Sequence, residues 1–109
     1  MFLVKTNIKV LGYGGKMYLI SVYDICTSGE GGKKRLPKVM KLLRKYLHHT
    51  QKSVFEGEIT DAKFMALKRE IKSLIKEDED YVVLFKSANK NNIERENVGL
   101  NFDPCSNII

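Results

Sequence analysis

One short segment of the chain, residues 81–85, is apolar at every position and reads YVVLF. Successive side chains of a β-strand point to opposite faces of a sheet, so Tyr81, Val83 and Phe85 are expected on one face and Val82 and Leu84 on the other. A strand that is apolar on both faces is stable only where both faces are covered. The sequence therefore predicts a sheet with a packed layer on each side.

Two segments have the periodicity of amphipathic helices and can supply one of these layers. Residues 33–49 and 60–76 both carry apolar residues three and four positions apart, the spacing of one buried helix face. Pro37 is expected in the first turn of the first helix, and Thr60 is expected to cap the second. The expected buried residues are Leu36, Val39, Met40, Leu43, Tyr46 and Leu47 in the first helix, and Phe64, Leu67, Ile71, Leu74 and Ile75 in the second.

Two further segments are rich in β-branched and aromatic residues and are expected to form strands beside residues 80–87. Residues 17–24 read MYLISVYD, and residues 51–59 read QKSVFEGEI. Gly57 in the second of these segments indicates a bulge or a point of close approach. Strands that alternate with helices over so short a chain predict a layered α/β or α+β sandwich, in which two helices cover one face of a small sheet.

The second face of this sheet needs a cover of its own, because two helices can cover only one face. A second copy of the chain, packed sheet against sheet, is the cover that we favour. The alternative is that the N-terminal segment or the C-terminal tail folds over the same face. Weaker strand signals lie in that tail, at residues 93–100 and 107–109.

The chain has 109 residues and a net charge of +6, which fits one compact domain with a polyanionic partner. Its apolar runs are far shorter than the roughly 20 residues that span a bilayer, and its start lacks the pattern of a secretory signal. We therefore expect a cytoplasmic protein that has no membrane association. Cys26 and Cys105 match no paired metal-ligand spacing, so neither is assigned to a disulfide or a metal.

Basic residues gather in the first predicted helix and just after it, where residues 33–55 contain no Asp or Glu. Four lysines recur at three- and four-residue spacing from Lys34 to Lys45, along one ridge opposite the apolar stripe, and one of the two following histidines continues the ridge. Like charges at this spacing destabilise a helix unless phosphates neutralise them, so we predict a nucleic-acid interface. The alternative is a plain solvated face. The predicted interface consists of Lys33, Lys34, Arg35, Lys38, Lys41, Arg44 and Lys45.

Asp24 ends the first predicted strand and is followed by a glycine-rich loop. A carboxylate at the end of a buried strand is costly unless it is hydrogen-bonded, paired or bound to a metal. By alternation it shares a sheet face with Tyr18, Ile20 and Val22. Its position leaves two interpretations open, an aspartate that caps the loop and a carboxylate that binds a metal.

Taken together, these segments resemble the Cas2 family of CRISPR-associated proteins. The matching segments are MYLISVYDI at 17–25, KKRLPKVMKLLRKYL at 33–47, TQKSVFEGEIT at 50–60 and DYVVLF at 80–85, in the order and spacing of the family. The resemblance implies an α+β, ferredoxin-like βαββαβ sandwich with an extra C-terminal strand and with dimerisation through the sheets. It also implies a short strand near Thr50, ahead of the strong strand signal.

The resemblance further implies a role in the acquisition of CRISPR spacers, as a homodimer that binds DNA or RNA and bridges dimers of the CRISPR integrase. Several members of the family are described as metal-dependent endonucleases. Carried onto this chain, Asp24 becomes the metal-binding and catalytic aspartate, with one Mg²⁺ shared across the dimer. Arg35, Ser53 and Phe55 match its usual polar and aromatic neighbours.

Some questions stay open at the level of the sequence. Two-metal nucleases normally gather several carboxylates, and this chain offers one candidate, Asp24. The residues therefore favour a scaffold, while the resemblance favours an enzyme. The alternative function is a free-standing, toxin-like ribonuclease on the same fold. Residues 1–16 precede the usual start of the family, so we expect one domain at 17–109, preceded by a mis-assigned start or by sequence added during cloning.

Overall fold

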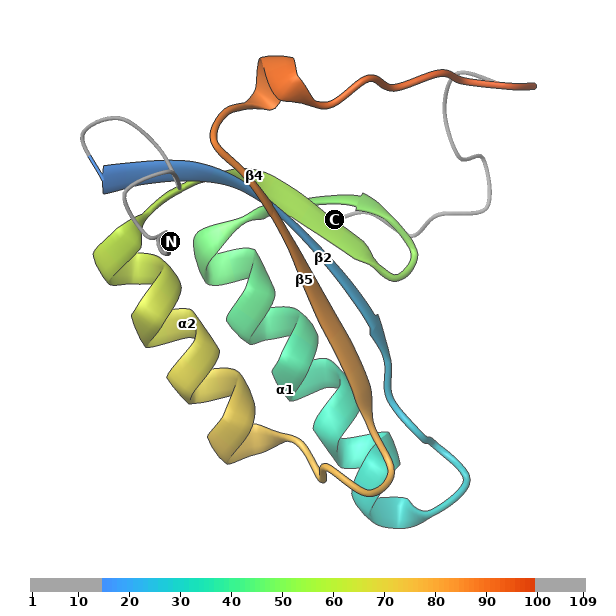
Figure 1. Cartoon of the computed structure of the whole chain (residues 1–109). Helices are drawn as coiled ribbons and strands as arrows, with labels where there is room; N and C mark the ends of the chain where they lie inside the picture. Colours follow the sequence, from blue (N-terminus) through green and yellow to red (C-terminus); the bar gives the residue numbers. More distant parts are fainter. Residues whose placement is uncertain (1–14, 100–109) are drawn as a thin grey trace.

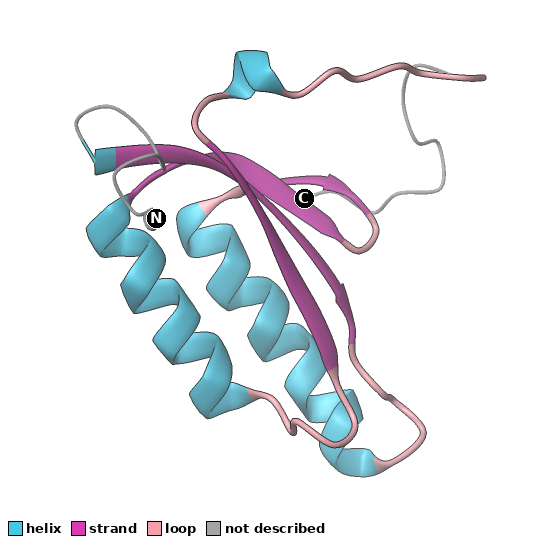
Figure 2. Ribbon diagram, in the orientation of Figure 1, coloured by secondary structure: helices cyan, strands magenta, loops and turns pink. Residues whose placement is uncertain are grey.

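The structure is a computed structural model, and it describes residues 15–99 (Figure 1). Its elements are β2 (Lys16–Asp24), α1 (Glu30–Tyr46), β3 (His48–Gln51), β4 (Val54–Thr60), α2 (Asp61–Leu74), β5 (Tyr81–Ser87) and the short 3-10 helix η3 (Lys90–Asn92). The strands form one antiparallel sheet of order β3-β4-β2-β5, and both helices lie on the same face of it (Figure 2). This arrangement is the ferredoxin-like βαββαβ sandwich that the resemblance implies.

The core lies between the sheet and the two helices. Alternate residues of each strand face the helices. Val82 and Leu84 of β5 share one face, as the sequence predicts, and this is the face that packs against the core. Both predicted helix stripes contribute to it. The buried apolar residues of the core include Met17, Leu19 and Tyr23 from β2, Phe55 and Ile59 from β4, Val39, Leu42 and Leu43 from α1, and Phe64, Leu67 and Ile71 from α2.

Helix α1 begins and ends three residues earlier than the sequence predicts. Its first turn contains Gly31 and Gly32, although a glycine-rich segment usually indicates a loop. Gly32 is needed there, because a Cβ atom on it would lie 1.6 Å from the carbonyl oxygen of Cys26. Pro37 consequently lies in the interior of the helix, and its predicted place in the first turn is wrong.

The segment between the helices forms a hairpin of β3 and β4, which confirms the short strand near Thr50. His48 and His49 lie in β3, so the prediction that one of them continues the lysine ridge of the helix is wrong. The register shifts between His49 and Gln51, so the bulge is at this point and not at Gly57. A Cβ atom on Gly57 would make only ordinary contacts, at 3.6 Å, so this glycine marks no close approach.

Helix α2 begins as predicted, because the Thr60 hydroxyl accepts a hydrogen bond from the Lys63 N–H at 3.2 Å. It ends at Leu74, two residues before the predicted end. After β5 and η3, residues 93–98 have no regular secondary structure, so the strand predicted for 93–100 is wrong over its described part. The strand predicted at 107–109 lies outside the described residues.

No helix within residues 15–99 is long and apolar enough to cross a membrane. Cys26 is a free thiol, and Cys105 lies outside the described part of the chain. The predicted domain begins at residue 17, whereas the first strand begins at Lys16. Nearly all of the segment expected to precede the domain lies outside the described residues.

Candidate nucleic-acid interface and acidic site

The face of the sheet opposite the helices, called the open face below, is largely apolar. Tyr81 and Phe85 remain 61% and 56% exposed there, so the described residues leave this part of the face open to solvent. Strand register places Ile20 beside Phe85, and Val22 between Val54 and Val83. The open face consists of Tyr18, Ile20, Val22 and Asp24 of β2, Val54, Glu56 and Glu58 of β4, and Tyr81, Val83, Phe85 and Ser87 of β5.

Asp24 lies at the end of β2, at the corner of the open face. Its cross-strand neighbour is Tyr81, and its side chain is exposed to solvent. Within residues 15–99 the carboxylate of Asp24 makes no hydrogen bond and no ion pair. The structure therefore does not support the interpretation that Asp24 caps the loop by a hydrogen bond, and this carboxylate is free to bind a ligand.

A second aspartate lies directly behind this corner. The carboxylate of Asp80 is completely buried and accepts hydrogen bonds from Arg35 Nε at 2.8 Å and Arg35 Nη2 at 3.2 Å. It also accepts the backbone N–H groups of Cys26, at 3.1 Å, and Lys76, at 2.9 Å. The bonds from Arg35 outweigh the burial, which acts in the opposite direction, and hold the pKa of Asp80 below its usual value.

The capacity of one chain to hold a metal is small. Among residues 15–99 there is no group of three or more His, Cys, Asp or Glu side chains arranged to hold an ion. Asp24 offers one carboxylate at the surface, which suits Mg²⁺, because this ion takes oxygen ligands and keeps several waters. Glu56 of β4 is too far from Asp24 to share an ion with it in one chain. Its cross-strand partner is Ile20, which precedes Asp24 by four residues along β2, or roughly 13 Å.

The lysine ridge predicted on the first helix is present on α1. Lys34, Lys38 and Lys41 are exposed, and within the described part of the chain no carboxylate forms an ion pair with them. Lys33 lies 3.6 Å from Glu30, and Lys45 lies 3.9 Å from Glu70, so each has one acidic neighbour. These exposed pairs contribute little energy and leave both lysines in reach of other anions.

The two arginines of the predicted interface have different surroundings. The Arg35 side chain is only 13% exposed, and its charge is compensated by Asp80 and by Glu79, at 3.1 Å. Its contact with nucleic acid stays a prediction, but its place in the fold is that of an internal ion pair. Arg44 is exposed and lies over the ring of Phe55, 5.9 Å from the centroid.

The two residues expected to support Asp24 do not lie beside its carboxylate. Phe55 is fully buried on the helix side of the sheet, stacked on His49 with the ring centroids 4.3 Å apart. Ser53 is exposed in the turn of the hairpin, where its carbonyl oxygen accepts the Tyr23 N–H at 3.1 Å. Phe55 supports the core, and Ser53 ties the turn to the residue before Asp24.

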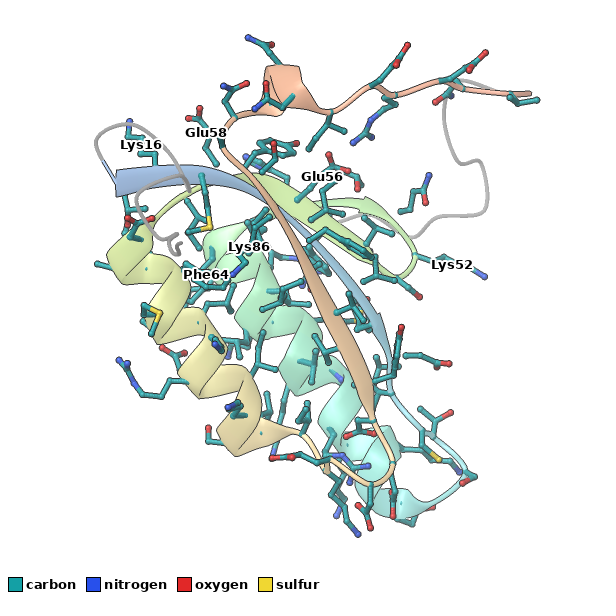
Figure 3. The ribbon with its side chains drawn as sticks, viewed as in Figure 1. Lys16, Lys52, Glu56, Glu58, Phe64 and Lys86 are labelled. Carbon is teal, nitrogen blue, oxygen red and sulfur yellow. The ribbon has the colours of Figure 1, made fainter. Side chains whose placement is uncertain are left out.

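The sequence indicates Glu56 only as an acid near Asp24 and does not predict its burial or its partners. Figure 3 shows Glu56 on β4 together with Glu58. Glu56 is 5% exposed and accepts hydrogen bonds from Tyr18 at 2.7 Å, Thr50 at 3.0 Å and Arg95 at 2.5 Å. Burial alone would raise the pKa of Glu56, but these three donors hold it below its usual value. Burial and the bond to Glu56 raise the pKa of Tyr18 to about 12.

The sheet order, the two helices on one face and the lysine ridge define a small ferredoxin-like domain with a strongly basic helix. The family described as "CRISPR associated protein Cas2" matches residues 17–95, which is more than half of the chain. The chain therefore belongs to the Cas2 family.

The chain is similar to curated and solved members of this family. It is 39% identical over 107 residues to "CRISPR-associated endoribonuclease Cas2" of Fusobacterium nucleatum, covering 97% of this chain and 100% of the relative. It is 41% identical over 91 residues to a Cas2 endoribonuclease of Moorella thermoacetica, covering 84% and 100%. A crystal structure of Streptococcus pyogenes Cas2 matches with a TM-score of 0.63 and 32% identity, over 74% of this chain and 100% of that one.

Proposed function

We propose that this chain acts in the cytoplasm in CRISPR spacer acquisition, as a homodimer that binds DNA or RNA and connects it to the CRISPR integrase. We also propose that the dimer hydrolyses phosphodiester bonds with Mg²⁺, and that Asp24 is the residue that holds the ion. The names of the curated relatives, which call them CRISPR-associated endoribonucleases, support the CRISPR role and the nuclease activity. The integrase is inferred from the family.

The observation that carries the proposal is the uncompensated row of lysines on α1. Lys34, Lys38 and Lys41 lie along one exposed side of a helix whose other side is committed to the core. The charges repel one another in the free protein, and the phosphates of a polynucleotide relieve this repulsion while counterions are released. A membrane surface is a poorer partner, because a helix that binds in the interface needs a free apolar face.

The open face supports the homodimer. Its exposed aromatic residues, Tyr81 and Phe85, lie on the edge strand β5, next to the apolar residues of β2 and β4. A second copy that packs on this face removes both aromatic side chains from water, which is favourable by about 25 cal/mol per Å² of apolar area. A two-fold axis through the open face would also bring the two Asp24 residues to a common surface.

Asp24 is the residue in the described chain that best suits a metal role at this surface. It is exposed and free of internal partners, and the partner subunit would supply a second copy of the same carboxylate. When bound, Mg²⁺ polarises a phosphate oxygen or lowers the pKa of a water molecule. The chain itself contributes the carboxylate, and the lysines of α1 hold the phosphate backbone.

Cleavage assays of the Asp24→Ala variant test the nuclease part of this proposal. Purified wild-type protein is incubated with labelled RNA and DNA, single- and double-stranded, with Mg²⁺ or with EDTA. We expect Asp24→Ala to lose Mg²⁺-dependent cleavage and to bind the same substrates with unchanged affinity, because the lysines of α1 are untouched. The matched control is Asp78→Ala, an exposed acid in the loop before β5. Unchanged cleavage by Asp24→Ala would refute the metal role.

A further inference from the structure

The chain just after Asp24 is held from two sides by groups that never reach the open face. On one side, the backbone of α1 at Gly32 packs against the carbonyl of Cys26 so closely that any Cβ atom would overlap with it. On the other side, the Cys26 N–H donates to the buried carboxylate of Asp80 at 3.1 Å. Two residues beyond Asp24, the backbone therefore has a fixed position.

Asp80 joins this point to two other parts of the fold, α1 and the segment after α2. Its two oxygens receive four hydrogen bonds, from Cys26 after β2, from Lys76 after α2 and twice from Arg35 of α1. Tyr81, the next residue, is the cross-strand neighbour of Asp24. The backbone of Asp24 is thus held by pairing with β5 at its own position and by Asp80 two residues later.

The chemistry of this cluster requires a carboxylate and not merely a polar side chain of that shape. All four N–H groups directed at the Asp80 oxygens are donors, and two of them belong to the charged guanidinium of Arg35. An amide in the same place would turn an NH₂ group toward two of these donors and leave them without an acceptor. With its side chain completely buried, Asp80 cannot touch a polynucleotide or a metal at the surface.

We propose that Asp80, together with Arg35, is a positioning residue that fixes the chain at 24–26, so that the Asp24 carboxylate keeps its place at the corner of the open face. The proposal rests on the proposed function in one respect, the role of Asp24 in cleavage. The fixed position of residues 24–26 is a property of the free protein and is tested without a cleavage assay.

The test compares Asp80→Asn with Asp78→Asn, an exposed acid two residues earlier in the same loop. Amide hydrogen exchange is followed by NMR in the free protein, well below the melting temperature. In Asp80→Asn we expect exchange of the Cys26 amide to rise at least tenfold and the carboxyl carbon resonance of Asp24 to shift. The Leu19 amide in the centre of β2 and both signals in Asp78→Asn should stay as in the wild type.

The second arm measures the Mg²⁺ dependence of cleavage. We expect Asp80→Asn to need at least tenfold more Mg²⁺ for half-maximal cleavage while its affinity for the polynucleotide is unchanged, a separation that a general loss of stability does not produce. If Asp80→Asn does not fold, Arg35→Gln replaces it in the NMR arm, because it removes the ion pair and leaves both backbone donors to Asp80. Exchange of the Cys26 amide is then expected to rise by half as much on a logarithmic scale. Cleavage and affinity are not compared for this variant, because Arg35 also belongs to the predicted nucleic-acid interface.

Each outcome decides one of the two proposals. The positioning role would be overturned if the Cys26 amide of Asp80→Asn exchanges as slowly as in the wild type. It would also be overturned if Asp80→Asn cleaves as Asp78→Asn does while Asp24→Ala is inactive. If Asp24→Ala cleaves as well as the wild type, the proposed catalytic function fails, and the NMR arm still decides whether Asp80 fixes the chain at 24–26.

Discussion

Replacing three lysines of α1 by glutamine is expected to change the salt dependence of nucleic-acid binding by a calculable amount. Lys34, Lys38 and Lys41 are exposed, and none has an acidic partner within the described residues, so each is available to one phosphate. Glutamine keeps much of the length and the helix propensity of lysine and removes the charge. The substitution therefore removes three phosphate contacts per chain and leaves the apolar face of α1 unchanged.

The magnitude follows from counterion release. The slope of log K against log[salt] is about −0.9 for each phosphate contact on duplex DNA, so the triple variant should have a slope shallower by about 2.7 per bound chain. Between about 50 and 200 mM salt, the wild type should lose roughly 40-fold more affinity than the variant. If both chains of a dimer contact one duplex, the difference in slope doubles.

Fluorescence anisotropy with a labelled duplex, repeated across this range of KCl concentration, measures both slopes. The matched control is the triple variant Lys63→Gln, Lys68→Gln and Lys72→Gln, which removes the same charge from exposed positions of α2. Equal slopes for the wild type and the α1 variant would refute the assignment of the interface to α1. If the α2 control changes the slope by the same amount, the change reflects the lower net charge of the protein and not contacts made by α1.

Two further predictions concern the stability of the fold. The folded-state pKa of Glu56 lies below its ordinary 4.5, so its contribution to the free energy of unfolding is present above pH 4.5 and is lost as the pH falls through the folded-state pKa. Denaturant titrations below about pH 5 should therefore show a weaker loss of stability in Glu56→Gln than in the wild type. The exposed control Glu58→Gln should behave as the wild type does. A steep acid limb kept by Glu56→Gln would contradict the role of this carboxylate. Gly32→Ala should destabilise the protein by about 1–3 kcal/mol in spite of the better helix propensity of alanine, because the new Cβ atom would overlap with the Cys26 carbonyl. Gly29→Ala should change the stability far less, because a Cβ atom at that position would meet nothing within 4 Å. A higher melting temperature for Gly32→Ala would contradict the close packing.

The parts of the fold that repeat along the chain could be predicted from the sequence. Alternation in β5 correctly separates Val82 and Leu84 from Tyr81 and Phe85, and the structure shows that the first pair packs on the core and the second lies on the open face. The end of α1 could not be predicted, since apolar spacing continues through Leu47 and no Gly or Pro follows. In the structure Leu47 has an extended backbone, and the chain continues directly into β3.

The parts that depend on contacts between distant segments could not be predicted. Position 32 of the helix requires a glycine because its backbone packs directly against the carbonyl of Cys26. A periodic pattern of apolar residues contains no information about such a backbone contact. Asp80 is the last of four consecutive acidic residues, 77–80, and nothing in the sequence distinguishes it from the other three, because its partner Arg35 is 45 residues away. Asp24 could be identified because it ends a strand and because of the resemblance, whereas Glu56 becomes notable only once Tyr18 and Arg95 lie around it.

Sedimentation velocity of the wild type and of Phe85→Asp, each at several micromolar concentrations, tests most directly whether a second copy covers the open face. The account predicts that the wild type has twice the chain mass of 12.5 kDa and that Phe85→Asp, folded as judged by circular dichroism, has the mass of one chain. A wild-type protein that stays at 12.5 kDa over the whole concentration range would contradict it.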